Sequence, residues 1–337
     1  MRHPCSGAGI SRRTLLAAAL TTALAAALAL PAAPARSAPA AAVEGPVRIV
    51  LPFGPGSGTD IYARLVAEKL GPALGVPVIV ENKPGANGII AAESVARAKP
   101  DGNTLLFTTN TTHAANPSMF KSLSYDPVKD YAPVTKLGNL TFLLVVAADG
   151  PYRTLQDLVA AARKQPGRVS YGASNSFGTV SGSKLGKIAG VEFLQIPYRS
   201  SPQIITDLLG GQVKFAFVDV AAAGPMLAAN KMRALTVLSD QRFPTLPDVP
   251  TMKELGYSQF DVVAWFGMFA PAGTPPAVVA QLNGKLTAIL KDPALRKRGA
   301  ELGIEIFGSS PEELGQYVGS QVDLWKQLTA DAGLTPQ

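Results

Sequence analysis

The residues best suited to chemistry form a glycine-rich turn, Gly54-Pro55-Gly56-Ser57-Gly58-Thr59, which follows an apolar run and precedes a predicted helix that opens at Asp60. Small residues let the backbone approach a ligand closely, and the first N–H groups of a helix lack partners and carry the positive end of its dipole. The turn therefore predicts an anion-binding site. The alternative is an ordinary strand-to-helix turn in which Thr59 or Asp60 is the N-cap and nothing is bound.

Neither nucleotide binding nor catalysis is predicted from these residues. The turn lacks the Lys-Ser/Thr pair that ends a P-loop, and its glycines at 54, 56 and 58 do not have the dinucleotide spacing. A serine hydrolase would need a histidine partner, but His113 is the only histidine after residue 40, and Gly56-Ser57-Gly58 is too short for a G-x-S-x-G elbow. No cluster of His or Cys has metal-ligand spacing. We therefore expect no catalytic residue, no metal and no cofactor.

Small polar residues recur where predicted strands end. The predicted strands are 47–53, 104–108, 169–172, 193–197 and 213–218, and the polar segments that follow them include 109–113, 173–179, 198–202 and Asp219. Strands that alternate with helices indicate a parallel, doubly wound sheet, in which ligands bind beyond the carboxyl ends of the strands. These segments are therefore expected to line one site.

Residues 1–40 are predicted to be a targeting segment. Arg12-Arg13 precedes an Ala/Leu run through Leu30, and Ala38-Pro39-Ala40 offers an A-x-A cleavage site, with Ala35 and Ala42 as other candidates. Paired arginines before an apolar run resemble a twin-arginine export signal; the alternatives are a plain secretory signal and an uncleaved anchor, although the run is shorter than the ~20 residues of a membrane span. We expect export to the periplasm with cleavage near Ala40.

The composition agrees with export to the periplasm. The one cysteine, Cys5, lies in the targeting segment, so the mature chain has neither a disulfide nor a cysteine metal site. Residues 1–40 carry four arginines and no acidic residue, so their removal lowers the formal net charge from +7 to +3. No basic run remains, and nucleic-acid binding is not expected.

The remaining chain is long enough for two lobes. Residues 117–140 are predicted to be irregular, Thr154 to begin a helix with a capping box, and helices to start at Pro293 and Pro311. Two long apolar strands, 141–148 and 262–270, flank the middle of the chain. We predict an α/β fold of two doubly wound sheets, with lobe 1 formed by 44–144 plus 265–337 and lobe 2 by 145–264, and with these two strands crossing between the lobes. The cleft between such lobes can close on a ligand.

Six separated segments, in order, carry a family resemblance. They are 50–60 (VLPFGPGSGTD), 81–86 (ENKPGA), 100–106 (PDGNTLL), 125–134 (YDPVKDYAPV), 207–213 (DLLGGQV) and 265–275 (WFGMFAPAGTP). Together they resemble the Bug/TctC-type receptors, the extracytoplasmic binding proteins of tripartite tricarboxylate transporters, over essentially all of the mature chain.

The resemblance implies a two-lobed, type II-like periplasmic binding protein of the Venus flytrap kind. It implies a small carboxylate ligand that is delivered to the membrane subunits of the transporter. We expect a monomer that binds neither nucleic acid nor a cofactor. By position, the ligand-binding loops of the family fall on Gly56, Ser57, Gly58, Thr59, Thr109, Asn110, Thr111, Thr112, Ser174, Asn175, Ser176, Thr179, Arg199, Ser200, Ser201 and Asp219.

The chain departs from the family pattern in the second lobe. Many relatives have a Gly-Asn-Gly-Thr-Ser-x-His run where residues 173–180 read Ala-Ser-Asn-Ser-Phe-Gly-Thr-Val, without a histidine. Phe177 is expected to narrow or line the cleft. The identity of the ligand therefore does not transfer from relatives that carry the other loop.

Several residues and the function itself have alternative interpretations. Arg199 is expected either to meet a second carboxylate of the ligand or to be a solvated edge charge, and Asp219 either to pair with an ammonium group or, as we favour, to cap the next helix. His113 is expected at the surface or as a loop anchor rather than as a ligand contact, and Trp265 and Phe266 in hinge and core packing rather than as a stacking platform. The alternatives to transport are a receptor that feeds a periplasmic sensor and, with less support, an exported enzyme acting on a small carboxylate.

Overall fold

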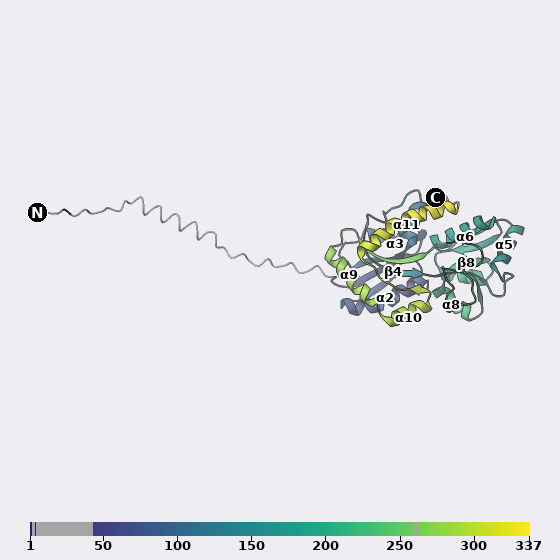
Figure 1. The fold of residues 1–337 in the computed structure, drawn as a ribbon, viewed down its shortest axis with the longest axis horizontal. Coiled ribbons are helices and arrows are strands. Elements are labelled where there is room, and N and C mark those ends of the chain that lie inside the picture. The colour runs from purple at the N-terminus through teal and green to yellow at the C-terminus, as the bar shows by residue number, and fades with distance from the viewer. Residues whose placement is uncertain (2–3, 5–42, 259, 261) are drawn as a thin grey trace. The chain divides into compact units, whose positions relative to one another are not determined.

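The computed structural model describes Met1, Pro4 and residues 43–258, 260 and 262–337. The predicted targeting segment therefore lies outside the described residues, apart from Met1 and Pro4 (Figure 1). Within the described part of the chain, no helix combines the length and the apolar character needed to cross a membrane.

The first and last parts of the described chain share a six-stranded sheet. Its strand order is β11-β4-β10-β3-β1-β2. The strands are β1 (Val47–Leu51), β2 (Val78–Asn82), β3 (Thr104–Thr109), β4 (Tyr131–Leu140), β10 (Ala264–Pro271) and β11 (Ile304–Glu305). β1 pairs in parallel with β2 and β3, whereas β10 pairs antiparallel with β3 and β4. The sheet is therefore mixed, with a parallel βαβ core.

The middle of the chain forms a second, five-stranded sheet with the order β7-β6-β8-β5-β9. Its strands are β5 (Phe142–Ala147), β6 (Val169–Ala173), β7 (Phe193–Pro197), β8 (Phe215–Asp219) and β9 (Met232–Leu238). β6 pairs in parallel with β7 and β8, and β5 pairs antiparallel with β8 and β9. Both sheets thus combine a parallel core with antiparallel strands, which confirms the predicted α/β fold class of two sheets.

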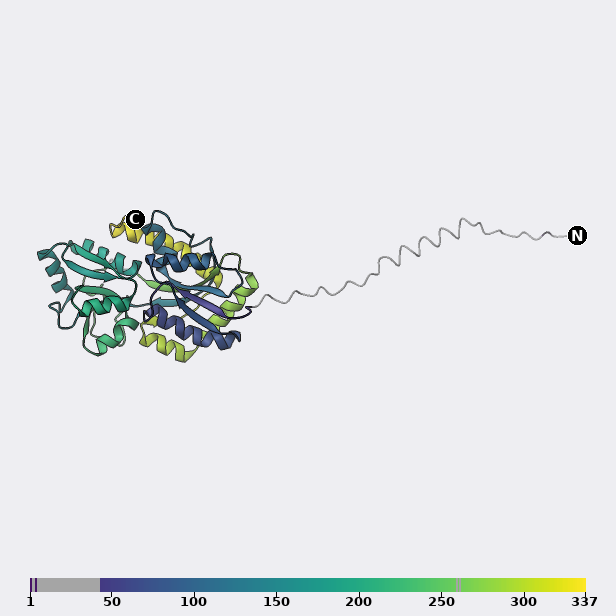
Figure 2. The same ribbon diagram turned by 180° about the vertical axis from the view of Figure 1, so that it is seen from behind.

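Helices follow the strands of each sheet. Those of the first lobe are α2 (Gly58–Leu74), η1 (Ala86–Gly88), α3 (Ile89–Ala96), η2 (Thr111–Ala115), α4 (Asn116–Met119), α9 (Pro276–Ile289), α10 (Pro293–Glu301) and α11 (Pro311–Asp331). Those of the second lobe are α5 (Leu155–Lys164), α6 (Ser176–Ala189), α7 (Ser201–Leu209) and α8 (Val220–Ala228). Figures 1 and 2 show the yellow C-terminal helices beside the purple N-terminal elements, so the chain returns to its first lobe.

The predicted capping box of α5 is present, since the Thr154 hydroxyl accepts from Asp157 N and the Asp157 carboxylate accepts from Thr154 N.

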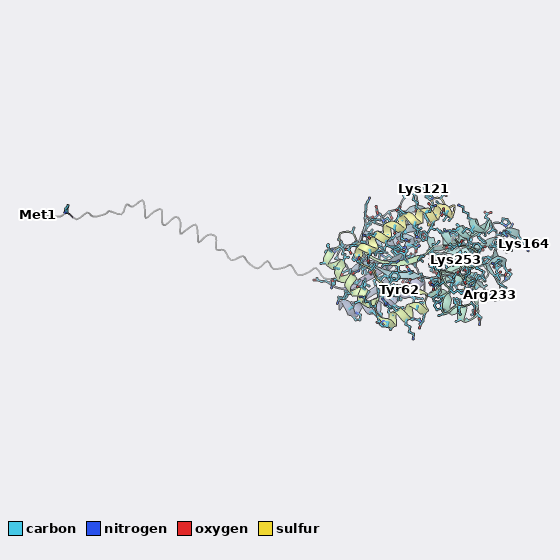
Figure 3. All side chains as sticks on the ribbon, in the orientation of Figure 1. Met1, Tyr62, Lys121, Lys164, Arg233 and Lys253 are labelled. Carbon is cyan, nitrogen blue, oxygen red and sulfur yellow. The ribbon has the colours of Figure 1, made fainter. Side chains whose placement is uncertain are left out.

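The core of the first lobe is aromatic and apolar. Tyr62, labelled in Figure 3, is fully buried, and its hydroxyl donates to the Leu137 carbonyl over 2.6 Å. Its ring packs against Phe107 and Phe266 with centroid distances of 5.5 and 5.2 Å. Trp265 is also fully buried, and its indole N–H donates to Gln321. The prediction of core packing for Trp265 and Phe266 is therefore confirmed.

The prediction that residues 117–140 are irregular is wrong for 117–119 and 131–140, which belong to α4 and β4, whereas 120–130 contain neither helix nor strand. The ten residues of β4 form a strand between β10 and β11. Pro133 and Gly138 obscured the strand pattern, because both residues are rare inside strands. Each lies beside a register shift in the pairing with β10, where a bulge tolerates a proline and a glycine with φ of 128°.

The chain crosses between the sheets twice, as predicted, but the crossings lie between strands. β5 belongs wholly to the second sheet and β10 wholly to the first. The first crossing is Thr141, whose N–H donates to the Gly303 carbonyl of the first lobe and whose carbonyl accepts from Val220 N of the second. The second crossing lies between β9 and β10. The long apolar strands that were expected to bridge the lobes are instead the inner strands of their own sheets.

Candidate functional site

The glycine-rich turn is organised by its helix cap. Ser57 is the N-cap of α2, with its hydroxyl accepting from Asp60 N at 3.3 Å, while the Asp60 carboxylate accepts from Gly56 N at 3.0 Å. These reciprocal bonds hold the turn in one conformation. The expectation of Thr59 or Asp60 as the N-cap is wrong, because Ser57 has the extended backbone of a cap and the helix begins at Gly58.

The Asp60 carboxylate stabilises the conformation of the glycine-rich turn. Its carboxylate is buried and accepts hydrogen bonds from Arg64 Nε at 3.0 Å and Asn82 Nδ2 at 2.9 Å. Burial alone would raise the pKa of Asp60, but the hydrogen bonds from Arg64, Gly56 and Asn82 outweigh it, and the pKa lies below its ordinary value. Asp60 is thus a stable anion that ties the turn to β2.

The predicted loop 109–113 is instead the end of β3 and the start of a π-helical turn, η2. The Thr109 hydroxyl accepts from Thr111 N at 3.2 Å, and the Thr112 hydroxyl bonds the Thr108 hydroxyl and His113 Nδ1 at 2.7 and 2.9 Å. These local side-chain hydrogen bonds replace some of the backbone hydrogen bonds that a regular α-helical start would make, and they favour the π-helical turn. Asn110 is left between β3 and η2 with 1% of its surface exposed.

In the second lobe, the polar segments are helix caps. Asn175 is the N-cap of α6, and its side chain accepts from Gly178 N at 2.9 Å. Asp219, the last residue of β8, is the N-cap of α8 and accepts from Ala222 N at 2.8 Å. The predicted capping role of Asp219 is therefore confirmed.

Asp219 also contacts the first lobe. Besides the Ala222 N–H, its carboxylate accepts from the Ser201 hydroxyl at 3.0 Å and from the Gly58 N–H at the start of α2. Burial raises the pKa of the Asp219 carboxyl above its ordinary value, although these hydrogen bonds oppose the rise. The carboxylate thus lies at two helix N-termini, one from each lobe.

The two lobes meet closely at the glycine-rich turn. A methyl group at Gly58 would overlap the Asp219 carboxylate, and one at Gly54 would lie 3.0 Å from Ser200 Cβ. The absence of side chains at these positions is therefore needed for the approach of the second lobe.

A direct hydrogen bond also joins the lobes. The Asn87 side-chain amide, in η1, donates to Ser176 Oγ of α6 and to Asn116 Oδ1, each over 2.7 Å. Asn87 adopts a left-handed backbone with φ of 50°, a conformation that asparagine tolerates better than most residues.

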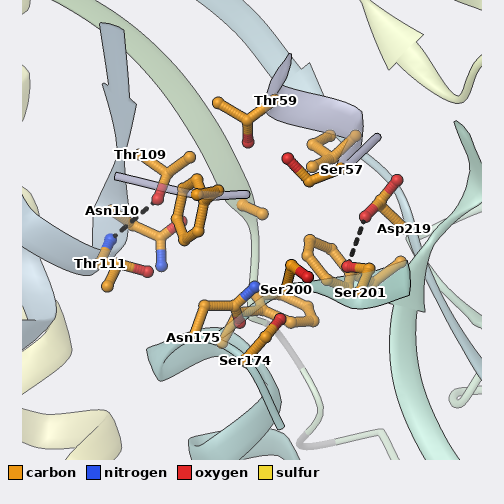
Figure 4. Close-up of a pocket in the computed structure, with 15 residues that line it drawn as sticks. Ser57, Thr59, Thr109, Asn110, Thr111, Ser174, Asn175, Ser200, Ser201 and Asp219 are labelled. Atoms are coloured by element: carbon orange, nitrogen blue, oxygen red, sulfur yellow. Dashed lines mark hydrogen bonds between the residues drawn. The ribbon is translucent and has the colours of Figure 1, made fainter. Parts of the chain in front are cut away.

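These segments enclose a small cavity between the two sheets (Figure 4). Its volume is about 20 Å³. Ten polar and five apolar residues line it: Ser57, Thr59, Thr109, Asn110, Thr111, Ser174, Asn175, Ser200, Ser201 and Asp219, with Phe53, Leu140, Phe142, Phe177 and Ala264. Of the described residues that line it, only Asp219 can carry a charge at neutral pH.

One polar group in the cavity wall lacks a partner. Asn110 Nδ2 is buried and has no hydrogen-bond partner among the described residues. A buried amide donor without a partner costs about 1–3 kcal/mol, so such a group in a pocket indicates a ligand or water that accepts from it.

Ten of the sixteen sequence-predicted site residues line the cavity, and the structure places the other six around it. Gly56 and Gly58 shape the turn, and Thr112 bonds Thr108 and His113. Ser176 accepts from Asn87, and Thr179 Oγ1 accepts from Gln195 at 2.8 Å.

Arg199 is the sixth residue outside the cavity wall. It is exposed, and its backbone N–H donates to the Gln203 side chain. This placement favours the solvated edge charge over a partner for a second carboxylate.

Sequence reasoning missed four apolar lining residues: Phe53, Leu140, Phe142 and Ala264. Three of them flank the crossings, with Leu140 and Phe142 on either side of Thr141 and Ala264 at the start of β10. The local sequence of all four residues is typical of ordinary core. For the three that flank a crossing between the sheets, that position is the signal that could have identified them as lining residues. Phe177 was expected to line or narrow the cleft, and it stacks on Phe142 with ring centroids 4.2 Å apart.

His113 lies outside the cavity wall and is an anchor, not a surface residue. It is fully buried and stacks on Phe269 at a centroid distance of 4.0 Å, with Tyr131 at 4.6 Å. Burial lowers the pKa of His113 to about 3, so the ring is neutral at ordinary pH.

The cavity wall offers hydrogen bonding rather than catalysis. No group of three or more His, Cys, Asp or Glu side chains in the described chain is placed to hold a metal ion. The lining serines lack a histidine neighbour within the described wall. Neutral hydroxyl and amide groups around an enclosed space are suited to binding a small polar molecule.

Comparison with known proteins gives a consistent result over most of the chain. Residues 62–334 match the family model of the tripartite tricarboxylate transporter family receptor. The structure of the periplasmic binding protein BugD is 36% identical, with a TM-score of 0.83, and the match covers 87% of this chain and 99% of that one.

Two other similar structures contain carboxylates. Rpa4515 of R. palustris, with adipate, is 32% identical with a TM-score of 0.84 and covers 87% of this chain and 99% of its own. MatC of Rhodopseudomonas palustris, with bound malate, is 32% identical with a TM-score of 0.80 and covers 84% of this chain and 98% of its own.

Proposed function

Because the chain belongs to the tripartite tricarboxylate transporter receptor family, whose members are periplasmic solute-binding proteins and not enzymes, we propose that it binds a small carboxylate between its lobes. The bound carboxylate is then delivered to the membrane subunits of a tripartite tricarboxylate transporter. The receptor acts in the periplasm as a monomer, after cleavage of residues 1–40 near Ala40.

The observation that carries this proposal is the unpartnered Asn110 amide in the cavity wall. A carboxylate oxygen is a strong acceptor for such a donor. The surrounding hydroxyls, among them Thr59, Thr111 and Ser174, supply further neutral donors. Neutral donors bind an anion without the desolvation penalty of a buried ion pair. The adipate of Rpa4515 and the malate of MatC support a carboxylate as the ligand.

Ligand entry requires the lobes to separate. A cavity of about 20 Å³ holds about one water molecule, which is less than any carboxylate needs. We propose that two lobes, 44–140 plus 264–337 and 142–238, move as two bodies about Thr141 and the segment between β9 and β10. These bounds replace 44–144 plus 265–337 and 145–264, which would divide β5 and β10 between the bodies. The ligand then takes its place between the bodies as they close, which distinguishes the loaded receptor from the empty one.

The test is binding to the mature protein, produced from Ala41. A ligand that binds only the folded state raises its stability by about 2.7 kcal/mol at a hundredfold excess over Kd, which appears as a rise of a few degrees in Tm. We expect at least one compound in a panel of mono-, di- and tricarboxylates, after removal of co-purified ligand by unfolding and refolding, to give such a rise. Uncharged and cationic analogues are expected to give none.

The same assay tests the role of Asn110. Asn110→Ala removes the unpartnered donor and is expected to weaken binding of the selected carboxylate about tenfold or more. The matched control is Asn103→Ala, since Asn103 precedes β3 at its other end and also has a buried amide atom without a partner in the described chain. Equal affinity in Asn110→Ala and the native protein would remove Asn110 from the site.

A further inference from the structure

We propose that Asn87 is a positioning residue that controls how long the bound carboxylate is retained. From a strained loop of the first lobe, its side chain holds the start of α6 in place when the lobes close. This inference rests on the proposed function, since it concerns release of the ligand from the same cavity. Asn87 is not among the residues that line the cavity, so it acts through other residues.

The first argument is the backbone of the loop that carries Asn87. Its four residues, Gly85 to Gly88, have φ values of 129°, 45°, 50° and 84°. Such values are ordinary for glycine, but they strain Ala86, and asparagine tolerates them only better than most residues. Of the three non-glycine residues with positive φ in the described chain, two lie in this loop. Strained backbone persists where the surrounding structure imposes it, and it is concentrated at ligand clamps and switch regions.

The second argument is the packing of this loop against the cavity wall. Gly88 lies so close to its neighbours that a Cβ atom there would be 2.7 Å from Thr112 Cγ2 and 2.9 Å from Pro52 Cβ. Thr112 directly follows the lining residue Thr111, and Pro52 directly precedes the lining residue Phe53. The strained loop therefore supports two segments of the wall.

The third argument is the hydrogen-bond network around the Asn87 side chain. Its Nδ2 donates to Asn116 Oδ1 and to Ser176 Oγ, each over 2.7 Å. Asn116 Nδ2 donates to the Asn87 carbonyl at 3.1 Å and to the Tyr125 hydroxyl at 3.0 Å, and that hydroxyl donates to the Thr112 carbonyl at 2.8 Å. Because Asn116 Nδ2 is held by these two acceptors, its side-chain oxygen faces Asn87. The network thus fixes the Asn87 amide in the direction of the second lobe.

The fourth argument is the position of Ser176, the residue that Asn87 contacts in the second lobe. Ser176 is fully buried and is the first residue of α6, directly after Asn175, which caps that helix and lines the cavity. α6 also contacts η2 of the first lobe. The Asn87–Ser176 bond therefore fixes a lining segment of one lobe against a lining segment of the other. Because its partners belong to different lobes, this bond forms on closure and breaks when the lobes separate.

The experiment measures the association and dissociation rates of the carboxylate selected from the panel, by stopped-flow mixing with the mature protein. Asn87→Gly removes the amide and suits the left-handed backbone, so the fold is expected to be retained, which denaturant unfolding checks. The dissociation rate is expected to rise about tenfold, because the closed form loses a hydrogen bond. The association rate, which depends on the open form, is expected to change less than about twofold. A side chain with a merely structural role would lower stability without separating the two rates.

The matched control is Asn230→Gly, since Asn230 also has a left-handed backbone, with φ of 53°, and is exposed. Both rates are expected to be unchanged in this variant. Ser176→Ala removes the acceptor and is expected to raise the dissociation rate as much as Asn87→Gly does. The double variant is expected to raise it no further than either single variant, because both substitutions remove the same bond.

The outcomes separate this inference from the proposed function. An unchanged dissociation rate in Asn87→Gly, or effects of Asn87→Gly and Ser176→Ala that add, would overturn the inference and leave the receptor function intact. If no carboxylate binds the native protein, the proposed function fails, and small-angle X-ray scattering of the ligand-free proteins then decides the inference. Asn87→Gly and Ser176→Ala are expected to have a larger radius of gyration than the native protein and Asn230→Gly, and equal radii would overturn the inference as well.

Discussion

Two neighbouring residues of the first lobe show how a buried nitrogen without a partner acquires its role from its surroundings. Asn110 Nδ2 and His113 Nε2 are both buried and unpartnered among the described residues. Asn110 faces the cavity, whereas His113 is enclosed by the rings of Phe269 and Tyr131. The first is therefore a ligand-binding candidate and the second a packing residue that is sensitive to protonation.

At the residue scale, stability is expected to fall below pH 6.5 because of His113. Its pKa is lowered from 6.5 to about 3 by burial, so the unfolded chain takes up a proton between these pH values that the folded chain does not. The contribution of neutral His113 to the free energy of unfolding is complete above pH 6.5. It is lost as the pH falls, so the free energy of unfolding is about 1.4 kcal/mol lower at pH 5.5. Denaturant unfolding at pH 7.5 and pH 5.5 measures it.

The control for this prediction is His113→Phe, which keeps a ring against Phe269 and cannot be protonated. Its loss of stability between the two pH values is expected to be smaller than that of the native protein by about 1.4 kcal/mol. Identical losses in both proteins would show that His113 is accessible to protons in the fold.

Three helices begin at the cavity, and their N-cap residues are part of its wall. α2, α6 and α8 each begin at a polar cap on the cavity side, namely Ser57, Asn175 and Asp219. Capping satisfies the first N–H groups of each helix within the chain. The positive ends of these helices are therefore largely used by the protein's own side chains.

The start of α2 is expected to tolerate no side chain at its first residue. Gly58→Ala places a methyl group against the Asp219 carboxylate, so closure is hindered and ligand affinity is expected to fall about tenfold or more. Titration with the ligand selected from the panel measures this effect.

Gly284→Ala is the matched control, since Gly284 lies within α9 and an added methyl group would meet nothing within 4 Å. This variant is expected to keep native affinity and to gain about 0.5–1 kcal/mol in stability. If both variants bound alike, the turn would not contact the second lobe during binding.

A cap far from the cavity is expected to affect stability alone. Thr154→Ala removes the acceptor that caps α5 and is expected to lower the free energy of unfolding by about 1 kcal/mol, with ligand affinity unchanged. Thr154→Ser retains the oxygen and is expected to preserve most of the stability. A loss of affinity in Thr154→Ala would contradict the independence of α5 from the site.

The arrangement of the whole molecule is that of two sheets joined at two crossings, with contacts that close the space between them. Asn87 bonds Ser176, and the Gly58 N–H donates to Asp219. Because these contacts are polar, they are suited to forming and breaking as a ligand enters and leaves.

Closure is expected to follow ligand binding in solution. Because Cys5 is the only cysteine of the full chain and lies in the targeting segment, a pair of cysteines in the mature protein can be labelled specifically. Ile90 in α3 and Ile188 in α6 are exposed, at 51% and 37%, and belong to different lobes. Resonance energy transfer between labels there is expected to change on ligand addition, with a midpoint equal to Kd.

Asn87→Ala, which removes the hydrogen bond between the lobes, is expected to shift that midpoint to higher ligand concentration. A signal that is unchanged at saturating ligand, in the presence of a calorimetric binding signal, would contradict closure as the response.

The sequence alone determined the order of strands and helices and the places where most of them start. Glycine turns, proline at first helical positions and polar caps are local signals, and they predicted α10 and α11, the capping box of α5 and the capping role of Asp219. The same signals misled at β4, where Pro133 and Gly138 sit at bulges that only the pairing with β10 makes acceptable. The polar residues of the cavity wall were predicted from their positions at the ends of predicted strands, which is also a local signal.

The exposure of Arg199, the contact of Asp219 with Gly58 and the apolar half of the wall depend on the tertiary structure. Phe53, Leu140, Phe142 and Ala264 are hydrophobic strand or turn residues whose local sequence is that of ordinary core. Leu140, Phe142 and Ala264 line the cavity because the two crossings bring the ends of β4, β5 and β10 together beside it, and Phe53 lines it from the segment that follows β1. Capping and turn formation depend on neighbours within a few residues, whereas the wall depends on how two lobes pack, and the local pattern does not contain that information.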